Sequence, residues 1–109
     1  MKTVSYAEFK QLDIRIVKVI KAKSIPKKSR ILKLIVDVGS DETRTIIAGG
    51  AEFYLPEQFV GNKYVALINL EPRKIAKIES QGMLLAAVFG DKPLWLKVDD
   101  SAPIGAKVI

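Results

Sequence analysis

The sequence contains no cysteine and no histidine among its 109 residues. Without cysteine, the chain can form no disulfide bond, no thiolate metal site and no thiol nucleophile. Without histidine, it lacks the residue on which zinc enzymes, Ser-His-Asp hydrolases and histidine general bases depend. The sequence therefore predicts a protein that is not an enzyme and that carries no metal or other cofactor.

Long apolar runs are absent as well. No stretch reaches the roughly 18 apolar residues that a membrane-spanning helix needs, and acidic residues occur too early for a secretory signal. Hydrophobic residues nevertheless make up 49% of the chain, which is enough for a packed core. A length of 109 residues suits one domain and not two. We therefore expect a single cytoplasmic domain covering residues 1–109, with no membrane partner.

Positive charge is concentrated in one part of the chain. The net charge is +6, but the segment from Ile14 to Val36 alone carries +8, so the rest of the chain sums to −2. The segment has no acidic residue, and its basic residues are Arg15, Lys18, Lys21, Lys23, Lys27, Lys28, Arg30 and Lys33. Such focused charge attracts polyanions. The alternative, a merely solvated strand face, is less favoured because no acidic residue is interspersed.

The apolar pattern predicts short strands rather than long helices. From Ile14 onward the apolar residues are mainly Ile and Val, which favour strands, and slips in their alternation indicate bulges. Ser5 and Glu8 have the spacing of a helix capping box. The expected elements are a helix within Thr3–Leu12, a strand from Ile14, a loop at Pro26, strands Leu32–Val38 and Thr43–Ala48, a plug helix within Glu52–Gly61, strands Lys63–Leu70 and Met83–Phe89, a short strand Leu94–Val98 and an irregular tail from Pro103.

Strands at this spacing, separated by turn residues, are typical of an all-β sandwich or barrel. The order of elements fits a five-stranded barrel with a plug between the third and fourth strands. Within the second strand, Leu32, Leu34, Val36 and Val38 alternate with other residues, so we expect these four side chains to face the core.

The segment from Asn69 to Ala87 has an unusual composition for a connection between two strands. Pro72 cannot continue a central ladder, and Gly82 allows another backbone to approach closely. Arg73, Lys74 and Lys77 supply charge, while Asn69, Ser80 and Gln81 supply short hydrogen-bonding side chains and Met83 a soft apolar one. Ser80 and Gln81 could equally serve only to shape a turn, and Met83 could be core filler.

This segment resembles the signature NLxPRxxxxxxSxGMxLAA of a tRNA-binding domain family. The family occurs in some methionyl-tRNA synthetases, in a subunit of phenylalanyl-tRNA synthetase, in endothelial monocyte-activating polypeptide II, in free-standing tRNA-binding proteins and in CsaA-like chaperones. Further matches cover roughly Asp13 to Ala87, and they include Asp13–Ile16, Val36–Gly39, Ile46–Gly49 and Pro56–Gly61.

The resemblance implies an oligonucleotide-binding barrel with a short N-terminal helix, a plug and a C-terminal strand extension. It implies recognition of tRNA by shape at the outer corner of its L, a homodimer joined through the terminal elements, and possible partnership with an aminoacyl-tRNA synthetase. The RNA-binding residues that it implies are Arg30, Lys33, Asn69, Arg73, Lys74, Ser80, Gln81 and Met83, with Lys18, Lys27 and Lys28 as further basic positions. The alternative function is CsaA-like peptide binding on the same dimeric scaffold.

Overall fold

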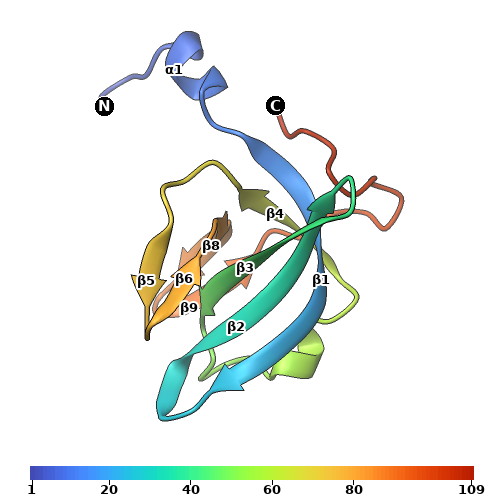
Figure 1. The fold of residues 1–109 in the computed structure, drawn as a ribbon. Helices are drawn as coiled ribbons and strands as arrows, with labels where there is room; N and C mark the ends of the chain where they lie inside the picture. Colours follow the sequence, from blue (N-terminus) through green and yellow to red (C-terminus); the bar gives the residue numbers. More distant parts are fainter.

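A bent five-stranded antiparallel sheet forms the body of the protein (Figure 1). The computed structural model describes all residues from Met1 to Ile109. The elements are α1 (Tyr6–Lys10), β1 (Ile14–Ile25), β2 (Lys28–Gly39), β3 (Glu42–Gly49), the 3-10 turn η1 (Pro56–Gln58), β4 (Lys63–Leu67), β5 (Arg73–Ile75), β6 (Ile78–Ser80), β7 (Met83–Leu84), β8 (Ala86–Phe89) and β9 (Lys92–Trp95). The strand order is β3-β2-β1-β4-β7, with β5–β6 and β8–β9 as separate hairpins.

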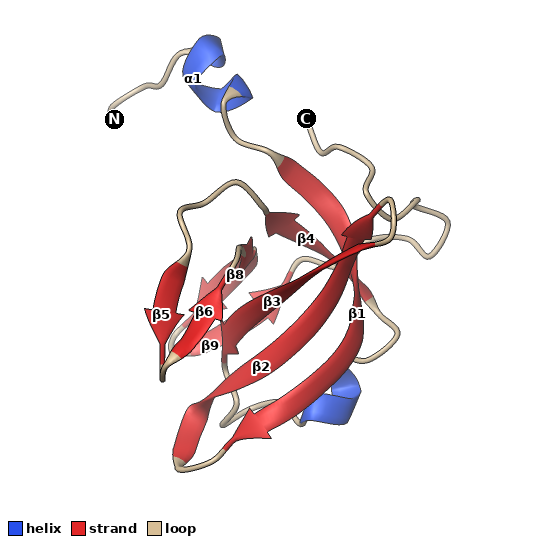
Figure 2. Ribbon diagram, in the orientation of Figure 1, coloured by secondary structure: helices blue, strands red, loops and turns tan.

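Strands dominate the fold and helices are confined to α1 and η1 (Figure 2). The expected all-β, five-stranded barrel of the oligonucleotide-binding type is therefore confirmed. None of the helices is long and apolar enough to cross a membrane.

β1 and β2 form a long hairpin that contains a β-bulge. The register of β1 against β2 shifts by one residue between Val19 and Lys21, which leaves Ile20 as the extra residue. Because side chains alternate between the two faces of a strand, this shift places Lys18, Lys21 and Lys23 on the same outer face. The bulge predicted from the slip in alternation is thus present.

The main core lies inside the barrel and is built from alternate residues of β1 to β4. The four side chains expected to face the core from β2 are at most 6% exposed: Leu32, Leu34, Val36 and Val38. Phe59, which follows η1, is 1% exposed and packs against the rings of Tyr54, Tyr64 and Trp95. The expected plug helix within Glu52–Gly61 is thus a single 3-10 turn that delivers one aromatic ring.

The barrel closes between β3 and β7 through side chains rather than through a strand ladder. The backbone N–H groups of Thr45 and Ile47 donate to Gln81 Oε1 and Ser80 Oγ, each at 3.0 Å. Gln81 N returns a hydrogen bond to the Thr45 carbonyl at 2.7 Å. At Gly82, φ is +152° and an added Cβ would lie 2.9 Å from the Leu67 carbonyl oxygen, so only glycine fits.

The C-terminal tail is irregular, as the sequence predicted, but it is held against β1 by backbone hydrogen bonds. Ile16 N donates to the Ala106 carbonyl at 2.9 Å, Gly105 N to the Ile16 carbonyl at 2.7 Å and Val108 N to the Ile14 carbonyl at 2.8 Å. Ala106 and Val108 also cover a second apolar cluster on the outside of the barrel. The tail therefore extends the fold in the manner of an added strand.

The short N-terminal helix expected within Thr3–Leu12 is present. It spans Tyr6–Lys10 and begins at the predicted capping box of Ser5 and Glu8. None of its residues is buried. The helix stands away from the barrel, at the end of the molecule where the C-terminus also lies (Figure 1).

The signature segment is not the simple loop that the sequence predicted. It contains the β5–β6 hairpin, whose two turn residues, Ala76 and Lys77, both have positive φ, at 52° and 67°. This geometry is normally signalled by Asn-Gly or Asp-Gly, so the Ala-Lys pair gave no warning of it. Pro72 lies directly before β5. Because proline has no backbone N–H to donate, it ends the connection that leads from β4 to the hairpin.

The remaining strands also differ from their predicted bounds. The fifth strand expected over Met83–Phe89 is divided into β7, which pairs with β4, and β8, which pairs with β9. The strand expected over Lys63–Leu70 ends at Leu67. The short strand expected over Leu94–Val98 is β9, which ends three residues earlier, at Trp95. Because the expected strand is divided after β7, β8 can pair with β9, the next strand along the chain.

Replacing Gly82 with alanine should destabilise the fold. A side chain at positive φ and a Cβ pressed on a carbonyl oxygen should together lower the free energy of unfolding by about 1–3 kcal/mol. Gly49→Ala is the matched control, because its φ is ordinary and an added Cβ meets nothing within 4 Å. Urea unfolding of the two variants checks this; equal midpoints would contradict the proposed role of Gly82.

Candidate nucleic-acid interface

The basic strands and the signature segment are connected by a row of neighbouring residues across the outer face. Lys23 of β1 pairs with Lys33 of β2, and Lys33 pairs with Ile47 of β3. Ile47 N–H donates to Ser80 Oγ, and Ser80 pairs with Arg73 in the β5–β6 hairpin. We call these five residues the cross-strand row. Neighbouring strands lie about 5 Å apart, so the row is long enough to meet several phosphates.

A second row runs parallel to the first. Lys21 pairs with Ile35, Ile35 pairs with Thr45, and Thr45 is bonded to Gln81 through both its backbone groups. Lys21 and Lys23 were counted in the basic segment but were not among the expected site residues. The bulge at Ile20 is the signal that could have assigned Lys21 and Lys23 to the outer face. With Ile20 as an extra residue, both side chains lie on the same face as Lys18.

The turn between β1 and β2 adds further positive charge. Lys27 and Lys28 are exposed there, and Lys27 has a φ of 65° in a turn of two residues. Arg30 is also exposed and lies 3.7 Å from a carboxylate oxygen of Glu52. This turn and the β5–β6 turn point toward the same end of the molecule (Figure 1).

Arg15 is the basic residue of this segment that does not belong to the outer face. Its guanidinium donates to Asp13 at 2.7 Å and to the Gly105 carbonyl at 3.2 Å. The hydrogen bond and the charge of Asp13 both raise the pKa of Arg15. Arg15 therefore anchors the C-terminal tail, and the charge that the segment can offer a ligand comes from the other seven residues, of which Lys18 and Lys33 are half-buried.

Three of the expected site residues hold the structure together. The Asn69 side chain accepts from Asp13 N at 2.8 Å and donates to the Gln11 carbonyl at 2.6 Å, which fixes the segment between α1 and β1. Ser80 is 5% exposed and its hydroxyl also donates to the Gly82 carbonyl at 3.2 Å. Gln81 Oε1 accepts a hydrogen bond from the backbone N–H of Thr45 in β3. For Asn69, Ser80 and Gln81 the geometry supports a positioning role, and direct RNA contact stays a prediction.

The other expected residues of the signature segment are free to meet a ligand. Arg73 and Lys74 are exposed on β5, and the Met83 side chain is 43% exposed rather than part of the core. Of the four arginines, only Arg73 has no carboxylate within salt-bridge distance. The hairpin therefore presents unpaired charge beside an accessible thioether.

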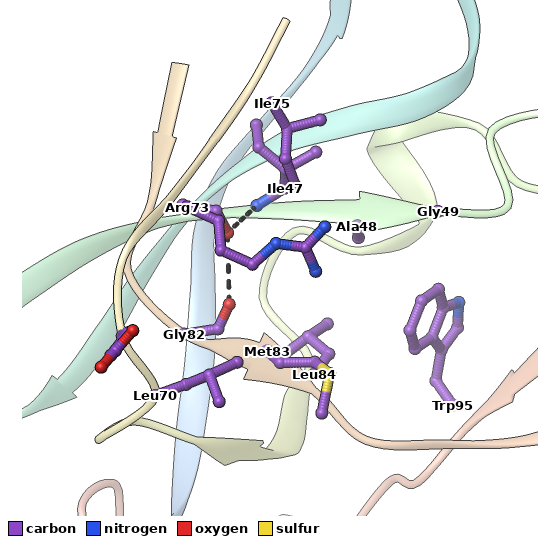
Figure 3. A pocket seen from close by; sticks show the side chains of 12 residues that line it. Ile47, Ala48, Gly49, Leu70, Arg73, Ile75, Gly82, Met83, Leu84 and Trp95 are labelled. Carbon is purple, nitrogen blue, oxygen red and sulfur yellow. Dashed lines mark hydrogen bonds between the residues drawn. The ribbon is translucent and has the colours of Figure 1, made fainter. Parts of the chain in front are cut away.

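A cavity of about 230 Å³ lies between β3, the signature segment and β9 (Figure 3). Its walls include Ile47, Ile75, Met83 and Trp95, and the hydrogen bonds of Ser80 lie along one side (Figure 3). We call it the hairpin cavity. It adjoins Lys33, because Lys33 is the cross-strand neighbour of Ile47.

Ser80→Ala and Arg73→Ala should separate structure from binding. Loss of the Ser80 hydroxyl leaves the Ile47 N–H without its partner, so the free energy of unfolding should fall by about 1–3 kcal/mol. Arg73→Ala removes an exposed, unpaired side chain and should change it by less than about 0.5 kcal/mol. Chemical denaturation measures both, and an equally large loss in Arg73→Ala would contradict this division.

Comparison with known proteins places this geometry in a family. Residues 14–107 match the family of the tRNA binding domain. The chain is 47% identical over 105 residues to methionine–tRNA ligase of Thermotoga maritima, a match that covers 96% of this chain and 16% of the ligase. It is 41% identical over 108 residues to the ligase of Thermococcus kodakarensis, covering 99% of this chain and 14% of that protein. The chain thus spans about a sixth of these relatives.

Solved structures agree with the sequence relatives. The MetRS-related protein of Pyrococcus horikoshii superposes with a TM-score of 0.94 at 37% identity, and each chain covers the other completely, at 100%. The chaperone CsaA of Bacillus anthracis superposes with a TM-score of 0.89 at 26% identity, covering 99% of this chain and 100% of that one. The chain belongs to the tRNA binding domain family.

Proposed function

We propose that this domain binds tRNA through the cross-strand row and the β5–β6 hairpin, and that it recognises the folded shape of the RNA rather than its sequence. The observation that carries the proposal is the continuity of the row, which joins Lys23 and Lys33 to Arg73 on one face. A single folded RNA can therefore contact the basic strands and the signature hairpin together.

The chemistry of this face suits phosphates rather than base edges. Lysine and arginine neutralise phosphates and release their counterions, which provides affinity without reading sequence. Double-stranded RNA hides its base edges in a deep and narrow groove, so selectivity must come from the curvature that the barrel matches. The hydrogen bonds of Asn69, Ser80 and Gln81 support this by fixing the position of the hairpin on the barrel.

The sequence relatives suggest the biological setting. Both similar ligases carry this module within a much longer chain, so the module supports a role in delivering tRNA to an aminoacyl-tRNA synthetase. We infer that the domain has no catalytic step of its own and acts in the cytoplasm.

A homodimer is the second part of the proposal. α1 buries none of its residues, and the apolar side chains of Tyr6 and Phe9 in the helix and of Leu12 just after it are 73%, 37% and 41% exposed. Apolar side chains at helical spacing normally pack against a surface. A second copy of this chain would cover them, in line with the dimer that the family resemblance implies.

Arg73→Ala combined with Lys74→Ala should weaken tRNA binding. Each lost phosphate contact should flatten the slope of log K against log salt by about 0.7–0.9, while the fold should be unaffected because both side chains are exposed. Filter binding of a tRNA transcript at several salt concentrations measures affinity and slope together.

Lys2→Ala combined with Lys107→Ala provides the control, because it removes the same charge from exposed positions near the two termini. An unfolded RNA homopolymer of similar length should bind less tightly than tRNA at physiological salt. If the homopolymer bound equally well, recognition by shape would be wrong.

The dimer should depend on the apolar residues in α1 and just after it. Phe9→Ser with Leu12→Ser should reduce the mass in solution from twice the 12.1 kDa of the chain to a single copy. Leu55→Ser serves as control, because Leu55 is 60% exposed but lies near η1, away from α1 (Figure 1). Light scattering measures the mass. A wild-type protein that is already monomeric would remove the dimer from the proposal.

Peptide binding is the second candidate function. The similarity to CsaA favours it, as do Val88 and Phe89 of β8, which are 75% and 76% exposed. A peptide that buries apolar surface should keep its affinity as salt rises, whereas bound tRNA should be released. Salt dependence of each ligand therefore distinguishes the two functions on one protein.

A further inference from the structure

The hairpin cavity combines features that a phosphate-binding surface does not need. Its walls are mainly apolar, and the Arg73 guanidinium extends across it toward Trp95 (Figure 3). Arg73 has no carboxylate partner within the protein, although Glu71 also borders the cavity. A guest that suits these walls is apolar and flat where it meets the indole and anionic where it meets the guanidinium.

Trp95 is held in place by two other aromatic rings that pack against it. Its ring lies 6.2 Å from that of Tyr54 and 5.8 Å from that of Phe59, measured between centroids. A ring that is already packed loses little freedom when a ligand binds against it. Met83, at the edge of the cavity, is 43% exposed, and its sulfur can contact an aromatic face.

We propose that the hairpin cavity takes up one unstacked nucleotide of the bound RNA. The base lies among Trp95, Met83 and Ile47, and Arg73 binds the phosphate of the same nucleotide. This inference rests on the proposed tRNA binding and adds to it a site for a single base. Unpaired nucleotides in folded RNA are commonly held in this way, by stacking on aromatic side chains or on arginine.

The position of the cavity fits the rest of the surface. Ile47 forms one wall of the cavity and is the cross-strand neighbour of Lys33, which itself pairs with Lys23. Phosphates on either side of the inserted nucleotide would therefore lie along the cross-strand row. The apolar walls would hold the base while Arg73 and the flanking lysines hold the backbone, so a change in the walls and a change in a lysine can be measured separately.

The single tryptophan makes the inference directly testable, because all tryptophan fluorescence comes from Trp95. An unmodified tRNA transcript should change that fluorescence on binding. Gly49→Leu should block the cavity: Gly49 borders it, has an ordinary φ, and has open space around an added Cβ. We expect this variant to bind tRNA about tenfold more weakly, to lose the fluorescence change and to flatten the salt slope by no more than the one phosphate contact of Arg73, about 0.7–0.9.

Met83→Ala is a second variant that does not depend on Gly49. Because Met83 is at the surface, the variant should fold normally and bind tRNA several-fold more weakly, with an unchanged salt slope. Lys33→Ala is the matched control, since it should flatten the slope while leaving the fluorescence change in place. Unfolding curves of all three variants establish that the folded state is retained.

The outcomes separate this inference from the proposed function. If tRNA binds with the expected salt dependence but Gly49→Leu and Met83→Ala bind as tightly as the wild type, the nucleotide site is overturned and tRNA binding stands. If no tRNA binds at all, the proposed function fails first. If an unfolded peptide changes the fluorescence of Trp95 and tRNA does not, the cavity is a peptide site and the inference is likewise overturned.

Discussion

The fold depends on how the free edge of β3 is closed. The N–H groups of Thr45 and Ile47 donate to the side chains of Gln81 and Ser80 rather than to backbone carbonyls of a neighbouring strand. Unsatisfied backbone groups at this edge would cost stability and would offer a site for unwanted pairing. Because the closing side chains come from the signature segment, the same contacts that complete the barrel also fix the β5–β6 hairpin beside the basic strands.

This arrangement explains why the signature segment mixes residues of such different chemistry. Asn69, Ser80, Gln81 and Gly82 are engaged with the barrel through hydrogen bonds or close backbone contact. Arg73, Lys74 and Met83 are exposed instead, on the strands β5 and β7 that these contacts hold against the barrel. If all residues of the signature segment were assigned to ligand contacts, the binding surface would be overestimated. If all were assigned to shaping a turn, the binding surface would be missed.

Much of the architecture could be predicted from the sequence, because local rules acted without competition. Alternation in β2 identified its core face, and the Ser5–Glu8 spacing identified the start of α1. The β5–β6 hairpin could not be predicted, since Ala76 and Lys77 take a turn conformation that their side chains do not favour. β6 packs against β3, and this contact between distant parts of the sequence is not visible in the turn residues themselves. The site was predictable as a set of residue types, but the structural engagement of Ser80 was visible only once Ile47 was placed beside it.

Charge and rigidity make different contributions on this surface. The lysines of β1 and β2 are long and flexible, so they attract an RNA from a distance but lose much of their effect as salt rises. The hairpin and Trp95 are held by hydrogen bonds and by packed rings, so their geometry does not change with salt. Affinity should therefore follow the lysines, whereas discrimination between folded and unfolded RNA should follow the elements that the closure of β3 holds in place. Loosening that closure should thus reduce selectivity more than it reduces binding.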